Sequence, residues 1–232
     1  MKVRIQFSKH GVVKYIGHLD VMRYFQKALR RADIPVKYTG GFSPHQVISF
    51  AQPLGVGVES ESEYFDMELE REDDLQAMKE RLNASMTDGI VVKAIVELPD
   101  NAKNAMASIA AASYEVRFRE GMEPAFDLSA EIEALLKQST IPYVKQTKKN
   151  EIEVDLKQGI YTLSAEKDKK DHWIIYMTVD ASSGGNIKPS TILEVLYKRA
   201  GDKLPPFALA ITRMEIFAKD NSGHLMPLIQ AN

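Results

Sequence analysis

The chain has no cysteine among its 232 residues and only one tryptophan. Without thiols it has no disulfide, no thiolate nucleophile, no Cys-ligated zinc site and no Cys-ligated iron–sulfur cluster. It also has no apolar run of about eighteen residues and no secretory signal at its start, so no membrane association is expected. These absences predict a cytoplasmic protein whose chemistry does not depend on sulfur.

The short motifs of phosphate cradles, dinucleotide sites and hydrolase nucleophiles are also missing. No G-x-x-x-x-G-K-[ST], G-x-G-x-x-G or G-x-S-x-G stretch occurs. Three of the five histidines, His10, His18 and His45, lie near the N-terminus, but their spacing is not that of metal ligands. We therefore predict neither a metal site nor a cofactor.

Charge is distributed unevenly, although the formal net charge is only −2. Residues 1–50 contain nine Lys or Arg and two Asp, which gives +7. Residues 51–98 contain four basic and twelve acidic residues, which gives −8. A concentrated basic segment favours an anionic partner, most simply the phosphates of a nucleic acid.

The hydrophobic periodicity of residues 1–98 alternates between the patterns of strands and helices. Val3 to Phe7 has the two-residue period of a strand, and Val12 to Ile16 is expected to return as a short second strand. His18 to Asp33 has apolar residues at helical spacing, and Pro35 ends that helix. Further strands and a second helix come after it, so the segment is expected to have the order β-α-β-β-α-β with an extra hairpin.

The same order of periods recurs after a small-residue segment, residues 99–112, which is expected to be a linker or connecting helix. The fold class predicted is α+β, with two tandem ferredoxin-like (split βαβ) domains and antiparallel sheets. The predicted domains are residues 1–98 and 113–232.

The first helix carries a basic stripe, which we define as Arg23, Lys27, Arg30 and Arg31. These residues are spaced i, i+4, i+7 and i+8 and therefore share one face of the helix. No acid lies at i±4 within the stripe. A solvated surface is the simplest explanation of such a face, and binding of RNA phosphates is the functional one.

His18 and Asp20 stand at the start of that helix, where Asp20 complements the helix dipole. His18 is expected either to cap the helix or to face a ligand as a polar group, with Asp20 orienting it.

The stretch "GGFSPH", residues 40–45, is the strongest local signal. Gly40 and Gly41 permit a close backbone approach, and Pro44 stiffens the second half of the stretch. Phe42 is suited to stacking on a base, and His45 to hydrogen bonding with a phosphate or base. The alternative is a structural loop in which Phe42 covers the core.

Residues 3 to 69 resemble the radical-SAM-linked protein family, bacterial proteins encoded beside, or fused behind, a radical S-adenosylmethionine enzyme. The resemblance is carried by His18-Leu19-Asp20, Ala28 to Ala32, Gly41 to His45, Ile48 to Ala51 and Pro53-Leu54-Gly55. The family usually has Ser where Gly17 stands and often has Asn where Ser43 stands.

The resemblance implies a standalone protein that works with a separate radical SAM enzyme, and it implies no catalytic residues. The chain is not that enzyme itself, because it lacks the cysteines that would hold the cluster. We therefore expect a non-catalytic accessory protein that binds tRNA or rRNA through the basic helix and the loop. The alternatives are an RNA-processing endonuclease similar to the CRISPR repeat-cleaving enzymes, with His18 as acid or base, and a pure protein–protein scaffold. The oligomeric state is not defined by the sequence.

Overall fold

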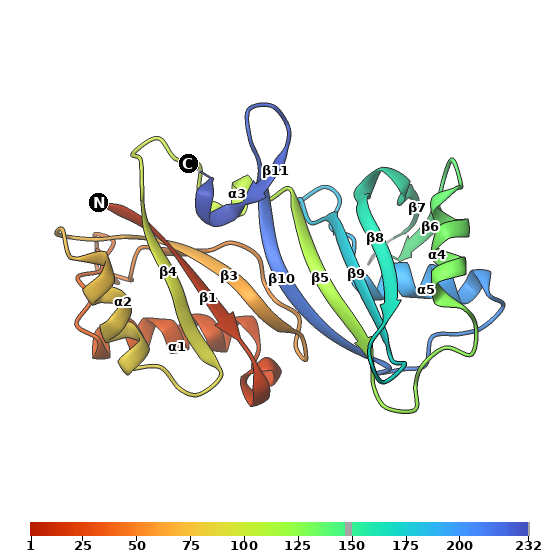
Figure 1. Cartoon of the computed structure of the whole chain (residues 1–232). Helices are drawn as coiled ribbons and strands as arrows, with labels where there is room; N and C mark the ends of the chain where they lie inside the picture. Colours follow the sequence, from red (N-terminus) through yellow and green to blue (C-terminus); the bar gives the residue numbers. More distant parts are fainter. Residues whose placement is uncertain (147–149, 232) are drawn as a thin grey trace. The chain divides into compact units, whose positions relative to one another are not determined.

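The structure, a computed structural model, describes residues 1–146 and 150–231. The fold is α+β, and most of its strand pairs are antiparallel (Figure 1). The chain forms two compact units. The first contains Met1–Ala110 and Arg213–Asn232, and the second contains Ala111–Thr212.

The first unit contains most of the elements predicted for residues 1–98. In chain order these are β1 (Lys2–Lys9), the 3₁₀ helix η1 (Gly11–Tyr15), α1 (His18–Arg31), β2 (Ile48–Phe50), β3 (Glu59–Glu68), α2 (Leu75–Ala84), β4 (Ile90–Leu98) and α3 (Ala105–Ser108). β1 lies between β3 and β4, and β2 pairs with the C-terminal half of β3. Helices α1 and α2 lie on one face of these strands (Figure 1).

The core of the first unit lies between that face and the two helices. Val3, Ile5 and Phe7 alternate along β1 and are almost fully buried, as the two-residue period predicts. Phe25 of α1 packs on Phe7 with ring centroids 4.5 Å apart. Aromatic pairs at this separation stabilise a core beyond the burial of their area.

Helix α1 has the predicted periodicity and ends where the backbone turns. Val21, Phe25 and Leu29 are buried on one face. Asp33 has a positive φ of 50°, and Pro35 comes two residues later, so the helix cannot continue. Because the apolar residues share one face of α1, the opposite face carries the polar residues.

The expected second strand at Val12 to Ile16 is wrong, because this segment forms η1. Gly11, with φ of 64°, turns the chain. The buried Lys9 ammonium donates hydrogen bonds to the carbonyls of Lys14 and Ile16, at 3.4 and 3.1 Å. Backbone carbonyls that point at Lys9 are not available to a neighbouring strand.

Residues 99–112 contain only one turn of helix, α3, and do not stand apart from the first unit. Ala105 is fully buried, and its amide donates to Asp66 Oδ2 at 2.7 Å. The segment is therefore packed on β3 up to residue 110, where the first unit ends.

The C-terminal segment belongs to the first unit, whereas the predicted division placed all of residues 113–232 in one second domain. β10 (Leu209–Lys219) passes from the second unit into the first at Arg213, and β11 (Leu225–Pro227) and the 3₁₀ helix η3 (Leu228–Gln230) come after it. Arg213 and Glu215 contact side chains of β3, and Arg4 of β1 donates to the carbonyl of Leu228. Contacts between residues that are 150 or more positions apart in sequence are not visible in local periodicity.

The second unit contains three antiparallel strands, in the order β5-β9-β8, and a separate β-hairpin. Its elements are β5 (Ala111–Phe118), α4 (Leu128–Leu136), β6 (Pro142–Gln146), β7 (Glu151–Asp155), η2 (Lys157–Gly159), β8 (Ile160–Lys167), β9 (Trp173–Asp180) and α5 (Pro189–Arg199). β6 pairs only with β7 among the described strands.

Candidate nucleic-acid interface

The outer face of α1 carries the basic stripe, as predicted. Arg23, Lys27 and Arg30 are exposed. The expectation that no acid neutralises the stripe needs one correction, because Asp20 lies three residues before Arg23 and its Oδ1 is 3.6 Å from NH1. The pair is exposed, so it is worth little and opens readily to a competing phosphate.

Arg31 differs from the other three cations of the stripe. Its NH2 donates to the carbonyl of Ser85 at 2.9 Å, and its guanidinium lies 5.8 Å from the centre of the Tyr24 ring. These contacts join the end of α1 to the end of α2. Arg31 therefore has a structural role that Arg23, Lys27 and Arg30 lack.

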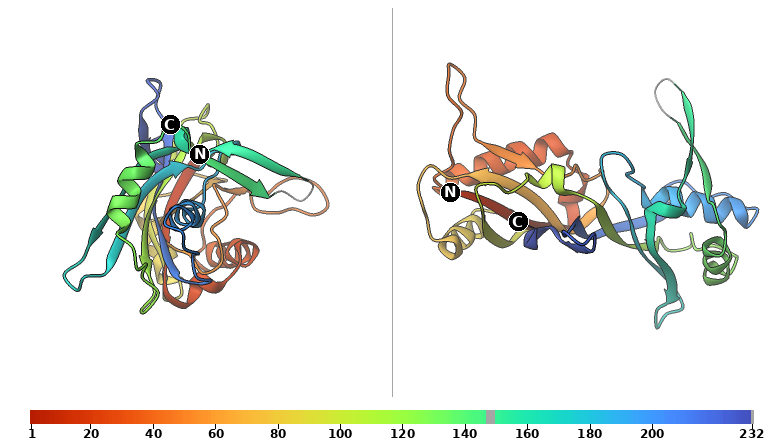
Figure 2. Two further views of the ribbon diagram at one scale, coloured as in Figure 1. Left: turned by 90° about the vertical axis from the view of Figure 1, so that its right-hand side faces the viewer. Right: turned by 90° about the horizontal axis from the view of Figure 1, so that it is seen from above.

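The loop that contains Gly40 to His45 is the tip of a narrow projection, which we call the finger (residues 37–47). Thr39 N donates to His45 O at 2.9 Å, and Val47 N donates to Lys37 O at 2.8 Å, so the two sides are held like a hairpin. In the right-hand view of Figure 2 it is the orange loop that extends away from the strands.

Phe42 is fully exposed at the tip of the finger, so it does not cover the core. Gly41 has φ of 97°, in the region that favours glycine, while Gly40 and Pro44 are exposed beside it. Thr39 Oγ1 lies 3.1 Å from His45 Nδ1 and accepts from His45 N at 3.1 Å, which orients that side chain.

The finger and the basic stripe meet at one backbone atom of α1. The carbonyl oxygen of Gln26 accepts a hydrogen bond from Arg30 Nε at 3.2 Å and another from Gln46 Nε2 at 3.3 Å. The base of the finger is thus beside a cation of the stripe. The structure brings these two predicted features together on one surface.

Much of the +7 charge of residues 1–50 is neutralised by the acidic segment that comes after it. Cations of β1, η1 and the finger pair with acids of β3. These ion pairs are Arg4–Asp66, Lys14–Glu59 and Lys37–Glu68, at 2.8, 3.0 and 2.7 Å. Among the described residues, no ion pair joins Lys27 or Arg30 to an acid. Lys27 and Arg30 are therefore the cations of the stripe that no described ion pair neutralises.

His18 lies apart from the stripe, because it is on the inner side of α1. It is half-buried, and its ring stands edge-on to Phe50 with centroids 5.6 Å apart. Burial lowers the pKa of His18, and nearby Lys9 lowers it further, while Glu63 opposes the shift. Asp20 is exposed and pairs with Arg23, so the expectation that it orients His18 receives no support from the geometry.

The sequence did not reveal a group of polar residues beside His18, which we call the buried cluster. It contains the buried charges Lys9, Glu63 and Arg213 and the half-buried Gln52. Arg213 is 2% exposed and Glu63 5% exposed. The guanidinium donates to both carboxylate oxygens, at 2.8 and 2.5 Å, and to Gln52 Oε1 at 2.8 Å. A fork of this kind satisfies both buried charges.

Lys9 is the second cation of the buried cluster, with only 2% of its surface exposed. Burial lowers its pKa, and Arg213 adds to this, whereas Glu63 acts in the opposite direction. The adjoining cavity, lined in part by Lys9, His18 and Glu63, has a volume of about 10 Å³. This is room for one water molecule at most, so the cluster in this form does not hold a substrate.

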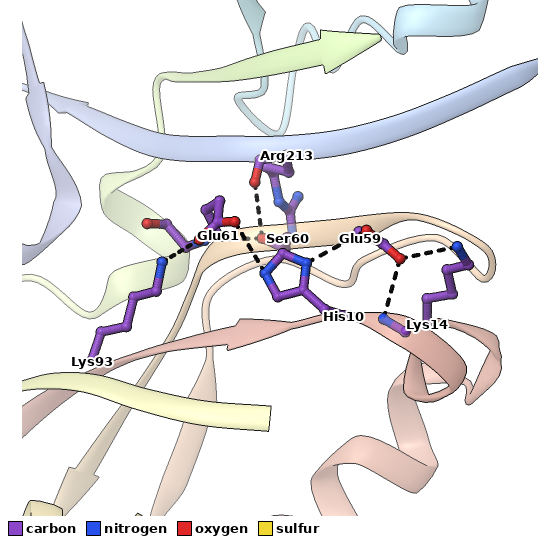
Figure 3. Close-up of polar contacts among 9 residues, drawn as sticks. His10, Lys14, Glu59, Ser60, Glu61, Lys93 and Arg213 are labelled. Carbon is purple, nitrogen blue, oxygen red and sulfur yellow. Dashed lines mark hydrogen bonds and ion pairs between the residues drawn. The ribbon is translucent and has the colours of Figure 1, made fainter. Parts of the chain in front are cut away.

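An outer network holds the end of β1 beside the cluster (Figure 3). His10 lies between Glu59 and Glu61, with ring nitrogens 3.5 and 3.2 Å from their carboxylates. Lys14 binds Glu59, and Lys93 binds Glu61. Despite these acids, the described residues include no group of three or more His, Cys, Asp or Glu placed to hold a metal ion.

A signal for the buried cluster is present in the sequence. Lys9 is in phase with the apolar Val3, Ile5 and Phe7 of β1, and Glu63 is in phase with the buried Phe65 and Met67 of β3. A charge in phase with a buried face indicates a buried charge pair. Arg213 has no comparable signal, because β10 is only half-buried along most of its length.

The lowered pKa of His18 predicts an effect on stability in acid. The unfolded chain takes up a proton near pH 6.5, whereas the folded chain does so only at lower pH, so His18 lowers the free energy of unfolding as pH falls from about 6.5. We expect His18→Asn to weaken the loss of stability between pH 7.5 and 5, measured by urea unfolding. His45→Asn, at an exposed position, is the control. An unchanged pH profile for His18→Asn would show that His18 is equally protonated in both states.

Comparison with known proteins shows a solved structure with a similar fold and a family to which the chain belongs. A chain in the crystal structure of a Cbf5-Nop10-Gar1 complex is similar in fold, with a TM-score of 0.53 and 10% identity over 95% of this chain. This chain spans about half (51%) of that one. A proposed dyp-type peroxidase of Shewanella oneidensis is 12% identical over 100% of this chain and 94% of its own, with a TM-score of only 0.21, and carries no argument.

Residues 2–189 match the bacterial family DUF2344, described as an uncharacterized protein conserved in bacteria, and the chain belongs to that family. No curated protein matches it. Within the described residues, no helix has the length and apolar character needed to cross a bilayer.

Proposed function

We propose that this protein binds RNA without modifying it, through a surface made of Arg23, Lys27 and Arg30 on α1 and the tip of the finger. The observation that carries the proposal is the Gln26 carbonyl, which accepts hydrogen bonds from both Arg30 and the base of the finger. The cations that would bind the RNA backbone then lie beside the base of the finger, and the aromatic ring for a base is at the tip of that finger. This is the combination that single-stranded RNA requires.

The electrostatic argument depends on which cations the fold leaves unpaired. The acids of residues 51–98 pair with cations of β1, η1 and the finger, but the described ion pairs do not include Lys27 or Arg30. Phosphates that bind these cations release condensed counterions, which drives association at low salt.

Phe42 supplies the second part of the surface. A fully exposed phenylalanine costs free energy in water, and its ring on the finger is open to solvent. Stacking of a base on an aromatic ring is worth about 1–3 kcal/mol and tolerates any base. The ring thereby distinguishes unpaired bases from a closed duplex.

The experiment is a salt titration of binding to a structured RNA with an unpaired loop. We expect Arg23→Ala, Lys27→Ala and Arg30→Ala together to reduce the slope of log K against log salt by about 2 to 3, because up to three phosphate contacts are lost. Phe42→Ala should weaken binding at every salt concentration and leave the slope unchanged.

The matched control replaces Lys169, Lys170 and Lys203, three exposed lysines of the second unit, by alanine. It has the same change in net charge and should keep the wild-type slope. Equal slopes for the α1 variant and the control would refute the surface. Shortening of the RNA during incubation would favour the endonuclease alternative, and an acidic protein that competes through α1 would favour the scaffold.

Two finer proposals accompany this one. Each unit is a ferredoxin-like domain, which the order β-α-β-β-α-β and the neighbours β4-β1-β3-β2 support in the first unit. The protein acts beside a separate radical SAM enzyme, a proposal supported only by the resemblance of residues 3–69. Purification of the tagged protein from its native host tests the partnership, and absence of any radical SAM enzyme under mild salt would contradict it.

A further inference from the structure

A cavity of about 290 Å³ lies at the base of the finger, in the first unit. It opens between the finger, β2, β3 and the ends of β1 and β4. Val47, Leu98 and Ala102 provide apolar walls, while Ser49, Glu68 and His45 provide polar groups. A pocket with apolar sides and a few polar groups is the usual form of a small-molecule site.

Of the two carboxylates that line this cavity, Glu68 is the one that retains capacity for a ligand. The other carboxylate, Asp66, is engaged by two nitrogens of Arg4 and by Ala105 N. Glu68 Oε2 accepts from Lys37 Nζ at 2.7 Å, and a carboxylate has about four lone-pair sites. The hydrogen bond from Lys37 also lowers the pKa of Glu68, which therefore stays ionised at neutral pH.

We propose that this cavity binds an unpaired guanine, with its Watson–Crick edge toward the Glu68 carboxylate. This inference rests on the proposed function, since the base would come from RNA held by the finger and α1. Guanine alone among the four bases offers a ring N–H and an adjacent amino group, two donors that match one carboxylate. The apolar walls cover the faces of the ring, and His45 lies at the rim.

The experiment compares RNA hairpins that differ only in one bulged base: guanine, inosine or adenine. Inosine lacks the amino group and keeps the ring N–H. We expect wild-type protein to bind the guanine hairpin roughly tenfold or more tightly than the inosine hairpin, because one charge-assisted hydrogen bond is lost. Glu68→Gln should remove most of this preference.

A variant that fills the cavity separates the pocket from the charge of Glu68. Ala102→Phe places a ring in the cavity, and we expect it to bind the three hairpins equally, with the salt dependence unchanged. Ala107→Phe is the control, because Ala107 is exposed on α3 and does not line the cavity. It should keep the guanine preference.

The outcomes separate this proposal from the proposed function. If wild-type protein binds all three hairpins with equal affinity, the guanine pocket is refuted while RNA binding stands. If no hairpin binds, RNA binding is refuted. Titration with guanosine 5′-monophosphate then tests whether the cavity binds guanine by itself. Saturable binding of that nucleotide, lost in Glu68→Gln, then supports a site for free guanine nucleotides, and absence of binding refutes it.

Discussion

Arg213→Met is expected to lower the free energy of unfolding of the first unit by about 3–5 kcal/mol, the usual result of removing one partner of a buried ion pair. Glu63 is 5% exposed and would lose both of its guanidinium hydrogen bonds, at 2.8 and 2.5 Å. Its charge would stay buried without its hydrogen-bonded partner, and only the electrostatic attraction of Lys9 would remain. The measurement is hydrogen exchange of the β1 amides in urea, because the single tryptophan, Trp173, lies in the second unit.

The double variant Glu63→Leu, Arg213→Met tests the reason for the loss. Removing both charges should restore most of the stability, since an apolar pair of similar volume often equals a buried ion pair. Lys37→Met is the control, because Lys37–Glu68 has a 2.7 Å contact but Lys37 is 54% exposed, and its loss should cost at most about 1 kcal/mol. A double variant as unstable as Arg213→Met would show that the cost arises from packing.

Arg4→Met is expected to have an effect of similar size and to release the C-terminal segment. Arg4 is fully buried and binds both oxygens of Asp66, at 2.8 and 3.1 Å. It also donates to the carbonyls of Leu228 and Ala231, at 2.8 and 2.9 Å. Loss of these bonds removes the counter-ion of a largely buried carboxylate, which keeps only the hydrogen bond from Ala105 N, and it removes the Arg4 donor from both carbonyls. The expected cost is about 3–5 kcal/mol.

The distinctive result for Arg4→Met is faster hydrogen exchange and proteolysis at residues 225–231. Leu228→Ala serves for comparison, because Leu228 is fully buried and its truncation loosens the segment by about 2–5 kcal/mol without touching Asp66. If the segment exchanges as slowly in Arg4→Met as in the wild type, Arg4 does not hold it, and apolar packing of η3 does.

Most helices and strands could be predicted from hydrophobic periodicity. β1 and α1 lie where the two-residue and helical periods place them, because a buried face imposes its period on a regular element. The segment at residues 12–16 could not be predicted in this way. Its conformation depends on Lys9, whose ammonium binds two carbonyls of that segment.

The candidate site was predictable in its exposed part only. The basic stripe is a property of one helix, and helical spacing alone places Arg23, Lys27 and Arg30 together. That the finger lies beside Arg30 could not be predicted, because it depends on a hydrogen bond between Gln46 and Gln26, which are twenty positions apart. The sequence leaves open whether His18 caps the helix or faces a ligand, and the structure places it on the inner side of the helix, against Phe50.

The sequence by itself determined the elements, the basic face of α1 and the exclusion of thiol chemistry, since each depends on residue type and local spacing. Only the tertiary structure decided which charges are neutralised, which are buried and which remain for a partner. Arg213 and Glu63 are 150 positions apart and become a buried pair when β10 returns to β3. The free energy of a charge depends on its distance from other charges and on its burial, and both are set when the chain folds.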